Sequence, residues 1–492
     1  MSEPGGLYDE ILYGDLTFFY THPNHLAAVA ALCGLAPPPV AGCRVLELGC
    51  GTGFNLLAMS HSLSNARLVG VDLSAKQIQH GTEAVAALGV TNVDLRAGRL
   101  EEVDATFGEF DFIIAHGVFS WVPADVQQAL LRVVRDRLAP QGIAFVSYNT
   151  LPGWSTRGTF RDLLLLFAPA DAPPAERVRR AKEAAGQFIA SLPADGTHYA
   201  DTLQADLAAL ADQPDYYVLA EHLASFNRPL YFTDFAALLA DHGLQHVSDS
   251  EYYKNSFVQP GEERAALTAA GKDFVRVEQL LDFRQQRDFR QSLICHASRS
   301  VPRAVDPALV LPLWLHPRVK FEPSADADAP LDTVRRGEGE PAFPVHDPLF
   351  RRILQRVHAA PGRKLRVEAF LPDLADLDLP FGLAIAPSLL ASAVSQGAAA
   401  DLWTLFAAEP SFATAPGERP RACPFARREA TVNPGVTNRF HLMSKLTGRD
   451  RDVFLRLDGR STRDELAESL GLGRAELDQC LARLATAAVL EG

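Results

Sequence analysis

Short runs of hydrophobic residues, many of them β-branched, alternate with helix-length spacers between residues 41 and 149. Gly, Asp or Pro bounds these runs, which is typical of buried strands. The runs lie at residues 44–48, 67–71, 92–95, 110–115 and 143–147. Strands separated by helices favour a parallel sheet covered on both faces, whose ligands bind at the carboxyl ends of the strands.

A helical period replaces this alternation further along the chain. Residues 176–191 and 201–210 are Ala-rich, with Arg and Glu at helical spacing, and predict a helical insertion. Residues 232–240 predict another helix and residues 244–247 another strand. We therefore expect the region up to about residue 300 to share one sheet.

The remaining chain predicts mostly helices. Arg, Gln and Leu are dense at residues 273–296, which predicts one long helix, and residues 317–344 are rich in Pro, Asp and Gly. Amphipathic segments follow at 345–410, and two clear helices are predicted at 462–470 and 473–487. Short helix pairs of this kind suit winged-helix-like modules.

The charge balance limits the classes of partner. The chain has 47 Lys and Arg against 60 Asp and Glu, for a formal net charge of −13. A nucleic-acid surface would have to be a local patch on an acidic body, so we expect no nucleic-acid partner. The N-terminus lacks the basic and apolar parts of a secretory signal, and no apolar run approaches the roughly 18 residues of a membrane helix. We expect a cytoplasmic protein without stable membrane insertion.

Cysteine spacing gives no sign of a metal site. Six cysteines are scattered over 492 residues, without a C-x-x-C pair or a His at ligand spacing. Structural zinc and a disulfide framework are therefore not expected, and we assign no metal ligand.

The most informative segment is a strand that runs directly into the glycine-rich residues 49–53 and then into a helix near Asn55. Glycine lets the backbone pass close to a ligand. A dinucleotide fingerprint would need its third glycine at position 54, which is Phe54. The spacing E-x-G-x-G-x-G from Glu47 instead suits S-adenosylmethionine, whose amino-acid end can lie over the amides of the turn.

Asp72 strengthens this interpretation. It ends the second strand, at the position where a carboxylate can accept hydrogen bonds from ribose hydroxyls. A plain tight turn for the glycines and a helix cap for Asp72 are the alternatives. The order strand, loop, helix, strand and Asp favours the cofactor.

The third and fourth strands leave open questions. After the third strand, where methyltransferases often carry an acidic residue, the chain has Gly98 and Arg99. Arg99 either stacks on the adenine ring or faces solvent. Residues 116–123 follow the fourth strand and contain no Asn/Asp-Pro-Pro-aromatic tetrad, which argues against base or amide N-methylation.

Together these motifs resemble class I S-adenosylmethionine methyltransferases with a methyltransferase regulatory domain, a group that includes bacterial protein-lysine methyltransferases acting on outer-membrane proteins. The resemblance covers residues 1 to about 300 closely and the last third more loosely. It rests on residues 8–10, 21–23, 47–53, 71–78, 116–123, 148–154, 221–223, 227–232, 288–296, 419–422 and 457–460.

The resemblance implies an α/β fold, with a Rossmann-like methyltransferase sheet, a helical insertion and α+β winged-helix-like C-terminal modules. The expected domains are a cofactor-binding domain, a helical cap or dimerisation segment, a regulatory segment that completes the sheet, and two winged-helix-like domains. Their expected limits are 1–156, 157–226, 227–300, 301–410 and 411–492. A homodimer is compatible with this arrangement.

The residues expected to hold the cofactor come from the N-terminal lead-in and the ends of the first four strands. They are Tyr13, His22, Glu47, Gly49, Cys50, Gly51, Gly53, Asn55, Asp72, Leu73, Gln77, Gly98, Arg99, His116, Gly117 and Val118. Tyr13 and His22 form either a lid over the cofactor or an ordinary N-terminal helix packed on the sheet.

The candidates for the methyl-transfer step follow the fourth and fifth strands. They are His116, Trp121, Tyr148 and Trp154. His116 either accepts a proton or only lines the pocket, and the aromatic rings are either pocket wall or core. The favoured acceptor is a lysine side chain of a protein substrate. A small-molecule methyltransferase and a non-catalytic cofactor-binding protein are the alternatives.

Overall fold

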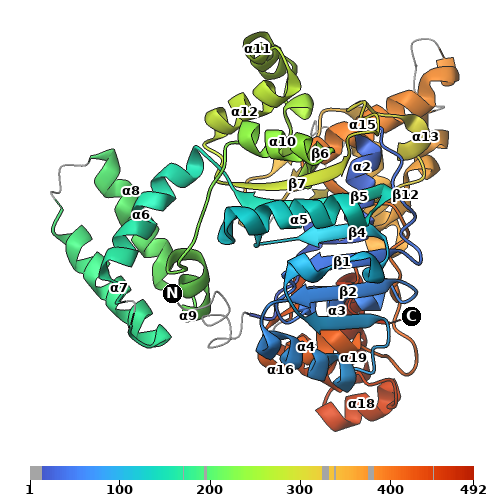
Figure 1. Ribbon diagram of the computed structural model, residues 1–492. Coiled ribbons are helices and arrows are strands. Elements are labelled where there is room, and N and C mark those ends of the chain that lie inside the picture. Colours follow the sequence, from blue (N-terminus) through green and yellow to red (C-terminus); the bar gives the residue numbers. More distant parts are fainter. Residues whose placement is uncertain are drawn as a thin grey trace.

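A seven-stranded sheet forms the centre of the molecule (Figure 1), in the order β3-β2-β1-β4-β5-β7-β6. The computed structural model describes residues 14–169, 171–192, 197–323, 332–336, 339–374, 382–446 and 448–491. The strands are β1 (Arg44–Leu48), β2 (Arg67–Asp72), β3 (Val93–Ala97), β4 (Phe110–Ala115), β5 (Leu138–Asn149), β6 (Leu244–Asp249) and β7 (Phe289–His296). Strands β1 to β5 pair in parallel, whereas β7 pairs antiparallel with both β5 and β6. The expected Rossmann-like methyltransferase sheet is confirmed.

The segment predicted as one long helix at 273–296 is in fact a helix followed by a strand. The helix α12 (Phe274–Gln285) ends at Gln286, whose φ of 47° is left-handed. The chain then turns back as β7, between β5 and β6. The prediction was wrong because Arg290 has the charge of an exposed helical position, whereas the structure buries it completely among carboxylates.

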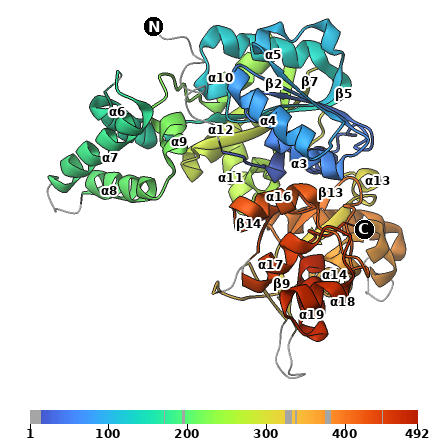
Figure 2. The same ribbon diagram turned by 90° about the horizontal axis from the view of Figure 1, so that it is seen from below.

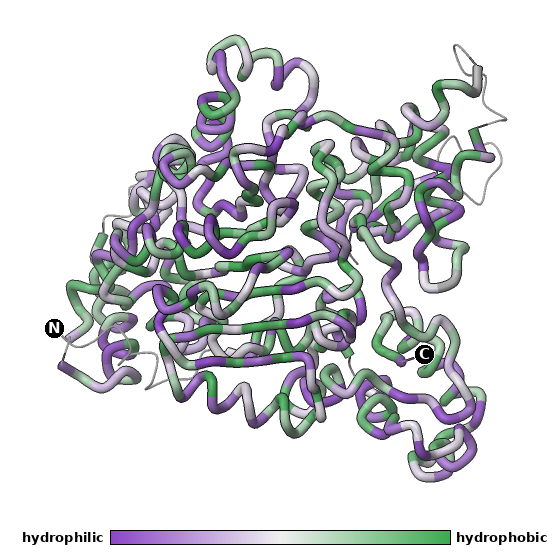
Figure 3. Tube along the Cα trace, turned by 45° about the vertical axis from the view of Figure 1, so that its right-hand side comes forward, coloured by the Kyte–Doolittle hydropathy of each residue, from purple (hydrophilic) through white to green (hydrophobic). Residues whose placement is uncertain are grey.

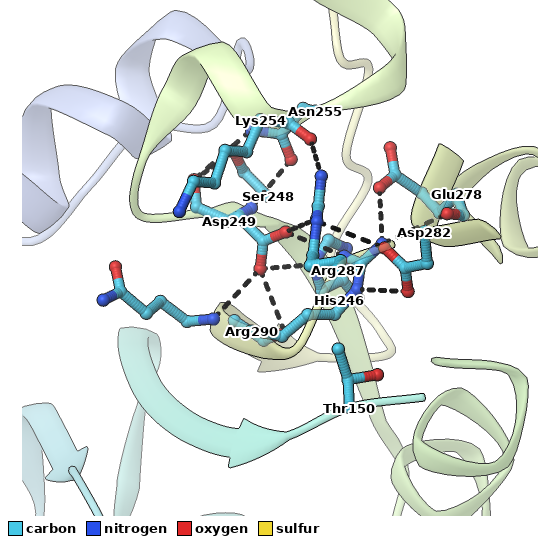
Figure 4. Close-up of polar contacts among 12 residues, drawn as sticks. Thr150, His246, Ser248, Asp249, Lys254, Asn255, Glu278, Asp282, Arg287 and Arg290 are labelled. Atoms are coloured by element: carbon cyan, nitrogen blue, oxygen red, sulfur yellow. Dashed lines mark hydrogen bonds and ion pairs between the residues drawn. The ribbon is translucent and has the colours of Figure 1, made fainter. Parts of the chain in front are cut away.

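Those carboxylates form a buried ionic cluster (Figure 4) of Asp249, Glu278, Asp282, Arg287 and Arg290. Its members come from β6, α12, β7 and the turn before β7. A buried charge is tolerated only when it is paired and hydrogen-bonded, and here the pairing joins three elements of the regulatory segment.

Helices cover both faces of the sheet. They are α2 (Pro23–Leu32), α3 (Phe54–Ser62), α4 (Ala75–Ala87), α5 (Ala124–Arg137) and α10 (Phe232–Asp241). All ten residues of α2 are buried, because the sheet lies on one side of it and the C-terminal half of the molecule on the other. Hydrophobic residues are frequent along the strands of the sheet, while hydrophobic and hydrophilic residues alternate along the outer helices (Figure 3).

A helical lobe stands apart from the sheet, at the left of Figure 1. It consists of α6 (Gly153–Phe167), α7 (Pro174–Ala190), α8 (His198–Ala211) and α9 (Asp215–Tyr217). The helix α11 (Gly261–Gly271) is not part of this lobe and lies beside α12. Leu164, Ala181 and Leu203 belong to a separate hydrophobic core that holds α6, α7 and α8 together.

The C-terminal half forms two modules below the sheet (Figure 2). The first has the strands β8 (Trp314–Pro317), β9 (Lys320–Glu322), β10 (Thr333–Arg335), β11 (Phe343–Pro344), β12 (Leu365–Arg366) and β13 (Trp403–Phe406), with helices α13 (Pro307–Val310), α14 (Pro348–Ala359) and α15 (Ala386–Ala399). The second has α16 (Pro424–Val432), β14 (Gly435–Thr437), β15 (Met443–Lys445), α17 (Gly448–Arg456), α18 (Arg463–Leu470) and α19 (Arg474–Thr486). Among the described residues, no helix combines the length and hydrophobicity that crossing a membrane requires.

Candidate functional site

The glycine turn lies between β1 and α3, at the carboxyl end of the sheet. Gly49, Gly51 and Gly53 all have left-handed φ values, of 71°, 54° and 72°. A β-carbon on Gly49 would come within 2.3 Å of Val118, and one on Gly53 within 2.6 Å of Leu95. At Gly51, no described atom lies within 4 Å of that position. Packing therefore requires two of the glycines, and the middle one borders open space where a ligand can approach.

Asp72 connects the end of β2 to this turn. Its carboxylate accepts hydrogen bonds from the backbone N–H of Gly51, at 2.8 Å, and of Ser74, at 2.9 Å. The neighbouring Leu73 is 45% exposed, and Gln77, one turn into α4, is buried. A carboxylate and an exposed apolar side chain thus lie side by side next to the turn, as the hydroxyls of a ribose and the face of a base would require.

Glu47 is the buried carboxylate at the centre of the site. It is 4% exposed, and its Oε1 accepts a hydrogen bond from Asn55 Nδ2 at 2.8 Å. Its Oε2 has no hydrogen-bond partner within the described part of the chain. Burial raises the pKa of Glu47 to about 8. A buried acceptor without a partner carries a penalty that a cationic ligand group would remove.

His116 follows β4 on the same edge. Its Nδ1 lies 2.9 Å from Ser147 Oγ and its Nε2 lies 3.2 Å from the hydroxyl of Tyr20. The ring also contacts Phe18, with centroids 4.1 Å apart. Burial lowers the pKa of His116 to about 4, so the imidazole is neutral at physiological pH. Gly117 donates its N–H to the same Ser147 Oγ at 2.9 Å, which fixes the backbone after β4.

The three aromatic candidates besides His116 separate into two groups. The rings of Trp121 and Trp154 meet nearly at right angles, with centroids 6.0 Å apart. Tyr148 is 1% exposed, and its ring lies 4.0 Å from that of Phe235 in the core beneath α10. Neighbouring residues of a strand point to opposite faces, so Ser147 faces His116 while Tyr148 faces the core. The structure thus does not bring Tyr148 to the edge of the sheet.

The other expected residues have more varied surroundings. Cys50 is half-buried, and burial together with the nearby Asp72 and Glu47 raises the pKa of its thiol well above its usual value. Gly98 directly follows β3 and precedes Arg99, whose guanidinium pairs with Glu101 at 3.2 Å and is 55% exposed.

The N-terminal lead-in packs against α3. His22 is buried, accepts the Asn24 N–H at the start of α2, and lies 2.8 Å from Ser62 Oγ. It therefore anchors two helices together. Tyr13 lies outside the described residues.

Sequence reasoning missed several neighbours of these groups. Tyr20 and Phe18 contact His116, and His441, from the far end of the chain, contacts Asn55 at 3.0 Å. No local pattern marks Tyr20 or His441, because each lies 96 or more positions away in sequence from the residue that it contacts.

Three family profiles match the chain. They are the Methyltransferase domain at residues 45–142, the Predicted methyltransferase regulatory domain at 214–296, and the PKMT, C-terminal winged helix domain at 418–487. The structure of PKMT2 from Rickettsia typhi in complex with AdoHcy superposes with a TM-score of 0.82 and 26% identity, covering 98% of this chain and 100% of that one.

Two proteins of Rickettsia prowazekii (strain Madrid E) are also similar in sequence. RP789 is 36% identical over 303 residues, which are 61% of this chain and 54% of that protein. RP028 is 36% identical over 228 residues, which are 46% of this chain and 91% of that protein. The match thus spans about half of the length of RP789 and nearly all of RP028.

The fold, the glycine turn and these matches define a class I methyltransferase. The chain belongs to the family of S-adenosylmethionine-dependent methyltransferases that carry a methyltransferase regulatory domain and a PKMT-type C-terminal winged helix domain.

Proposed function

We propose that the protein transfers a methyl group from S-adenosylmethionine to a lysine side chain of a protein substrate. The observation that carries the cofactor assignment is the buried Glu47, whose Oε2 has no partner among the described residues. The lysine acceptor is supported by the similarity to PKMT2 over 98% of this chain.

The cofactor fits the polar groups at the carboxyl edge of the sheet. Glu47 would receive the ammonium of its amino-acid end, and Gly51 would let that end pass close to the backbone. Asp72 would accept from the ribose hydroxyls, and Leu73 would pack on the adenine. Acidic, hydrogen-bonding and apolar side chains would thus match the ammonium, the ribose and the adenine of S-adenosylmethionine, respectively.

S-adenosylmethionine supplies a methyl group on a sulfonium, which reacts by in-line displacement. The chain has to hold the acceptor nitrogen in line and exclude water. A lysine amine must first lose its proton, and this costs roughly 4.6 kcal/mol at pH 7. Desolvation between aromatic rings lowers that cost, because it disfavours the ammonium form.

His116 is better suited to line the site than to remove this proton. Its pKa of about 4 makes it a much weaker base than lysine, and both ring nitrogens already face Ser147 and Tyr20. Trp121 and Trp154 are suited to enclose the lysine stem. Cation–π contact with such rings contributes about 0.5 to 2 kcal/mol to binding an ammonium.

The remaining parts of the chain fit a division of labour. We propose that residues 1–156 bind the cofactor, that 227–300 brace it, and that 301–410 and 411–492 select the protein substrate. Residues 157–226 would make a homodimer, since this lobe exposes Leu166, Phe188 and Tyr199. We also propose a cytoplasmic location and no nucleic-acid partner, and the net charge of −13 supports the second of these.

Transfer of labelled methyl groups tests the proposal. The protein is incubated with methyl-labelled S-adenosylmethionine and a lysate from a strain that lacks this gene, and the Asp72→Ala variant, which should bind the cofactor more weakly, is the control. Label should enter lysine side chains of one or a few proteins, as located by mass spectrometry. Label confined to metabolites would favour a small-molecule methyltransferase, and no transfer to either fraction would contradict the proposal.

A further inference from the structure

The C-terminal winged-helix domain packs directly on α3, the helix that follows the glycine turn. Phe54 and Leu57 of α3 share one hydrophobic core with Phe425 and Ala426 of α16. The rings of Phe54 and Phe425 are 5.9 Å apart. In Figure 2, α16 lies beside α3, although some 370 residues separate the two helices in sequence. The last domain of the chain therefore contacts the cofactor-binding region itself.

A polar contact between His441 and Asn55 crosses this interface next to Glu47. His441 is 4% exposed, and its backbone has a left-handed φ of 62°. Its Nε2 lies 3.0 Å from Asn55 Oδ1. A left-handed histidine is uncommon, and the conformation turns this side chain out of the β14–β15 hairpin connection toward α3.

The orientation of the Asn55 amide is determined by its neighbours. The backbone N–H of Phe18 can only donate, and it points at Asn55 Oδ1 at 3.0 Å. The atom that faces His441 is therefore the oxygen, and His441 Nε2–H is the donor. The opposite end of the amide, Nδ2, donates to Thr21 Oγ1 at 3.0 Å and to Glu47 Oε1 at 2.8 Å.

We propose that His441 is a positioning residue for the amino-acid end of S-adenosylmethionine, acting through Asn55 on Glu47. Together with the Phe18 N–H, it holds Asn55 Oδ1, which keeps Nδ2 on Glu47 Oε1 and leaves Oε2 to face the ligand. The winged-helix domain thereby sets the affinity of the first domain for its cofactor. This inference rests on the proposed placement of the cofactor ammonium at Glu47.

Two ligands separate this role from a merely structural one. S-adenosylhomocysteine carries the amino-acid end, whereas 5′-methylthioadenosine has the adenosine and thioether without it. A variant that only loosens the fold weakens both ligands. A variant that misplaces Glu47 weakens S-adenosylhomocysteine alone.

The experiment is calorimetric titration of the full-length protein with both ligands. His441→Leu should bind S-adenosylhomocysteine about three- to tenfold more weakly, as expected for the loss of one buried hydrogen bond, and 5′-methylthioadenosine as wild type does. His441→Gln, whose amide N–H can reach Asn55, should restore the affinity to within about twofold. If His441→Leu does not fold, His441→Asn replaces it, because asparagine tolerates the left-handed backbone and its side chain is one methylene shorter than that of glutamine.

Phe440→Leu is the matched control. Phe440 is buried beside His441 and stacks on His316, with centroids 4.0 Å apart. Its truncation should lower the melting temperature and leave both affinities unchanged. Wild-type affinity for S-adenosylhomocysteine in His441→Leu, or equal weakening of both ligands, would overturn the inference.

Glu47→Gln tests the proposed site separately. Wild-type affinity for S-adenosylhomocysteine in that variant refutes the cofactor placement. A loss of affinity in Glu47→Gln with none in His441→Leu refutes only the role of His441.

Discussion

Two buried carboxylates of the same sheet have opposite surroundings. Asp249, at the end of β6, accepts hydrogen bonds from Arg287 at 2.7 Å and from Arg290 at 2.8 Å. Burial alone would raise the pKa of Asp249, but Arg290 and Arg287 hold it well below its usual range. Among the described residues, Glu47 near the end of β1 is hydrogen-bonded only by the neutral amide of Asn55, and burial raises its pKa to about 8. Asp249 is therefore ionised and paired with cations of the protein, whereas Glu47 has no cationic partner in the described residues and is mostly protonated near neutral pH.

The two carboxylates thus differ in role: Asp249 stabilises the fold, and Glu47 is the one that we propose to bind the cofactor. The cluster around Asp249 also fixes the turn before β7, where the backbone carbonyl of Arg287 accepts the N–H of Gly153 and that of Asp288 accepts the N–H of Thr150. The turn thereby holds the start of α6, and with it Trp154. The charges of the Asp249 cluster are paired with one another, whereas the ionised form of Glu47 is stabilised only by a cationic ligand.

The largest effect is expected from breaking the satisfied site. Asp249→Asn removes the charge that pairs with two guanidinium groups, and a buried pair broken from one side costs about 3 to 5 kcal/mol of folding stability. Urea unfolding followed by circular dichroism measures the loss. An exposed pair is the control: Arg96 and Asp94 are 2.6 Å apart and about half exposed, so Asp94→Asn should change stability by less than about 0.5 kcal/mol. Equal effects of the two variants would contradict a structural role for the cluster.

The unsatisfied site should respond in the opposite sense. The pKa of Glu47 in the folded protein, about 8, lies above its unfolded value, so the free protein loses stability as pH rises toward 8. Glu47→Gln removes that dependence. Between pH 5 and pH 8, the stability of the free variant relative to wild type should therefore rise by about 2 to 4 kcal/mol. Urea unfolding at several pH values measures this. The same variant should bind the cofactor about 10- to 100-fold more weakly.

Proton release gives an independent check on Glu47. At pH 7 the free carboxyl is mostly protonated, and an ammonium beside it lowers its pKa, so binding should release up to one proton. Calorimetry in buffers of different ionisation enthalpy counts this proton. Its persistence in Glu47→Gln would assign the release to another group.

A local sequence motif marks Glu47, the carboxylate proposed to bind the cofactor, whereas no such motif marks the structural cluster around Asp249. Glu47 and Asp72 lie in a local motif, where strand, glycine turn and strand follow within about 25 residues. Arg290 carries no such signal, because its partners come from β6 and α12, and without them its charge indicated a helix surface. His441 could not be found for the same reason. Strand alternation could have placed Tyr148 in the core, had the facing of Ser147 been known.

A smaller effect is expected at Asp72, which belongs to both classes. It holds the turn through the Gly51 N–H and would also hold the ribose. Asp72→Ala should weaken cofactor binding by about 1.5 to 3 kcal/mol through lost charge-assisted hydrogen bonds. Asp72→Asn, which keeps one acceptor oxygen, should lose less. Calorimetry with S-adenosylhomocysteine compares the two, and unchanged affinity in Asp72→Ala would refute the ribose contact.

The smallest effect is expected from a charge at the same edge of the sheet that is neither buried nor without a partner. Arg99 follows β3, where its guanidinium pairs with Glu101 at 3.2 Å and is 55% exposed. Exposed pairs contribute about 0 to 1 kcal/mol because water screens them. Arg99→Ala should therefore change cofactor affinity by less than about twofold, which corresponds to roughly 0.4 kcal/mol. Calorimetry at low and high salt measures this. A loss of tenfold or more that persists at high salt would mean that the guanidinium stacks on the adenine ring, since stacking is screened far less than an exposed ion pair.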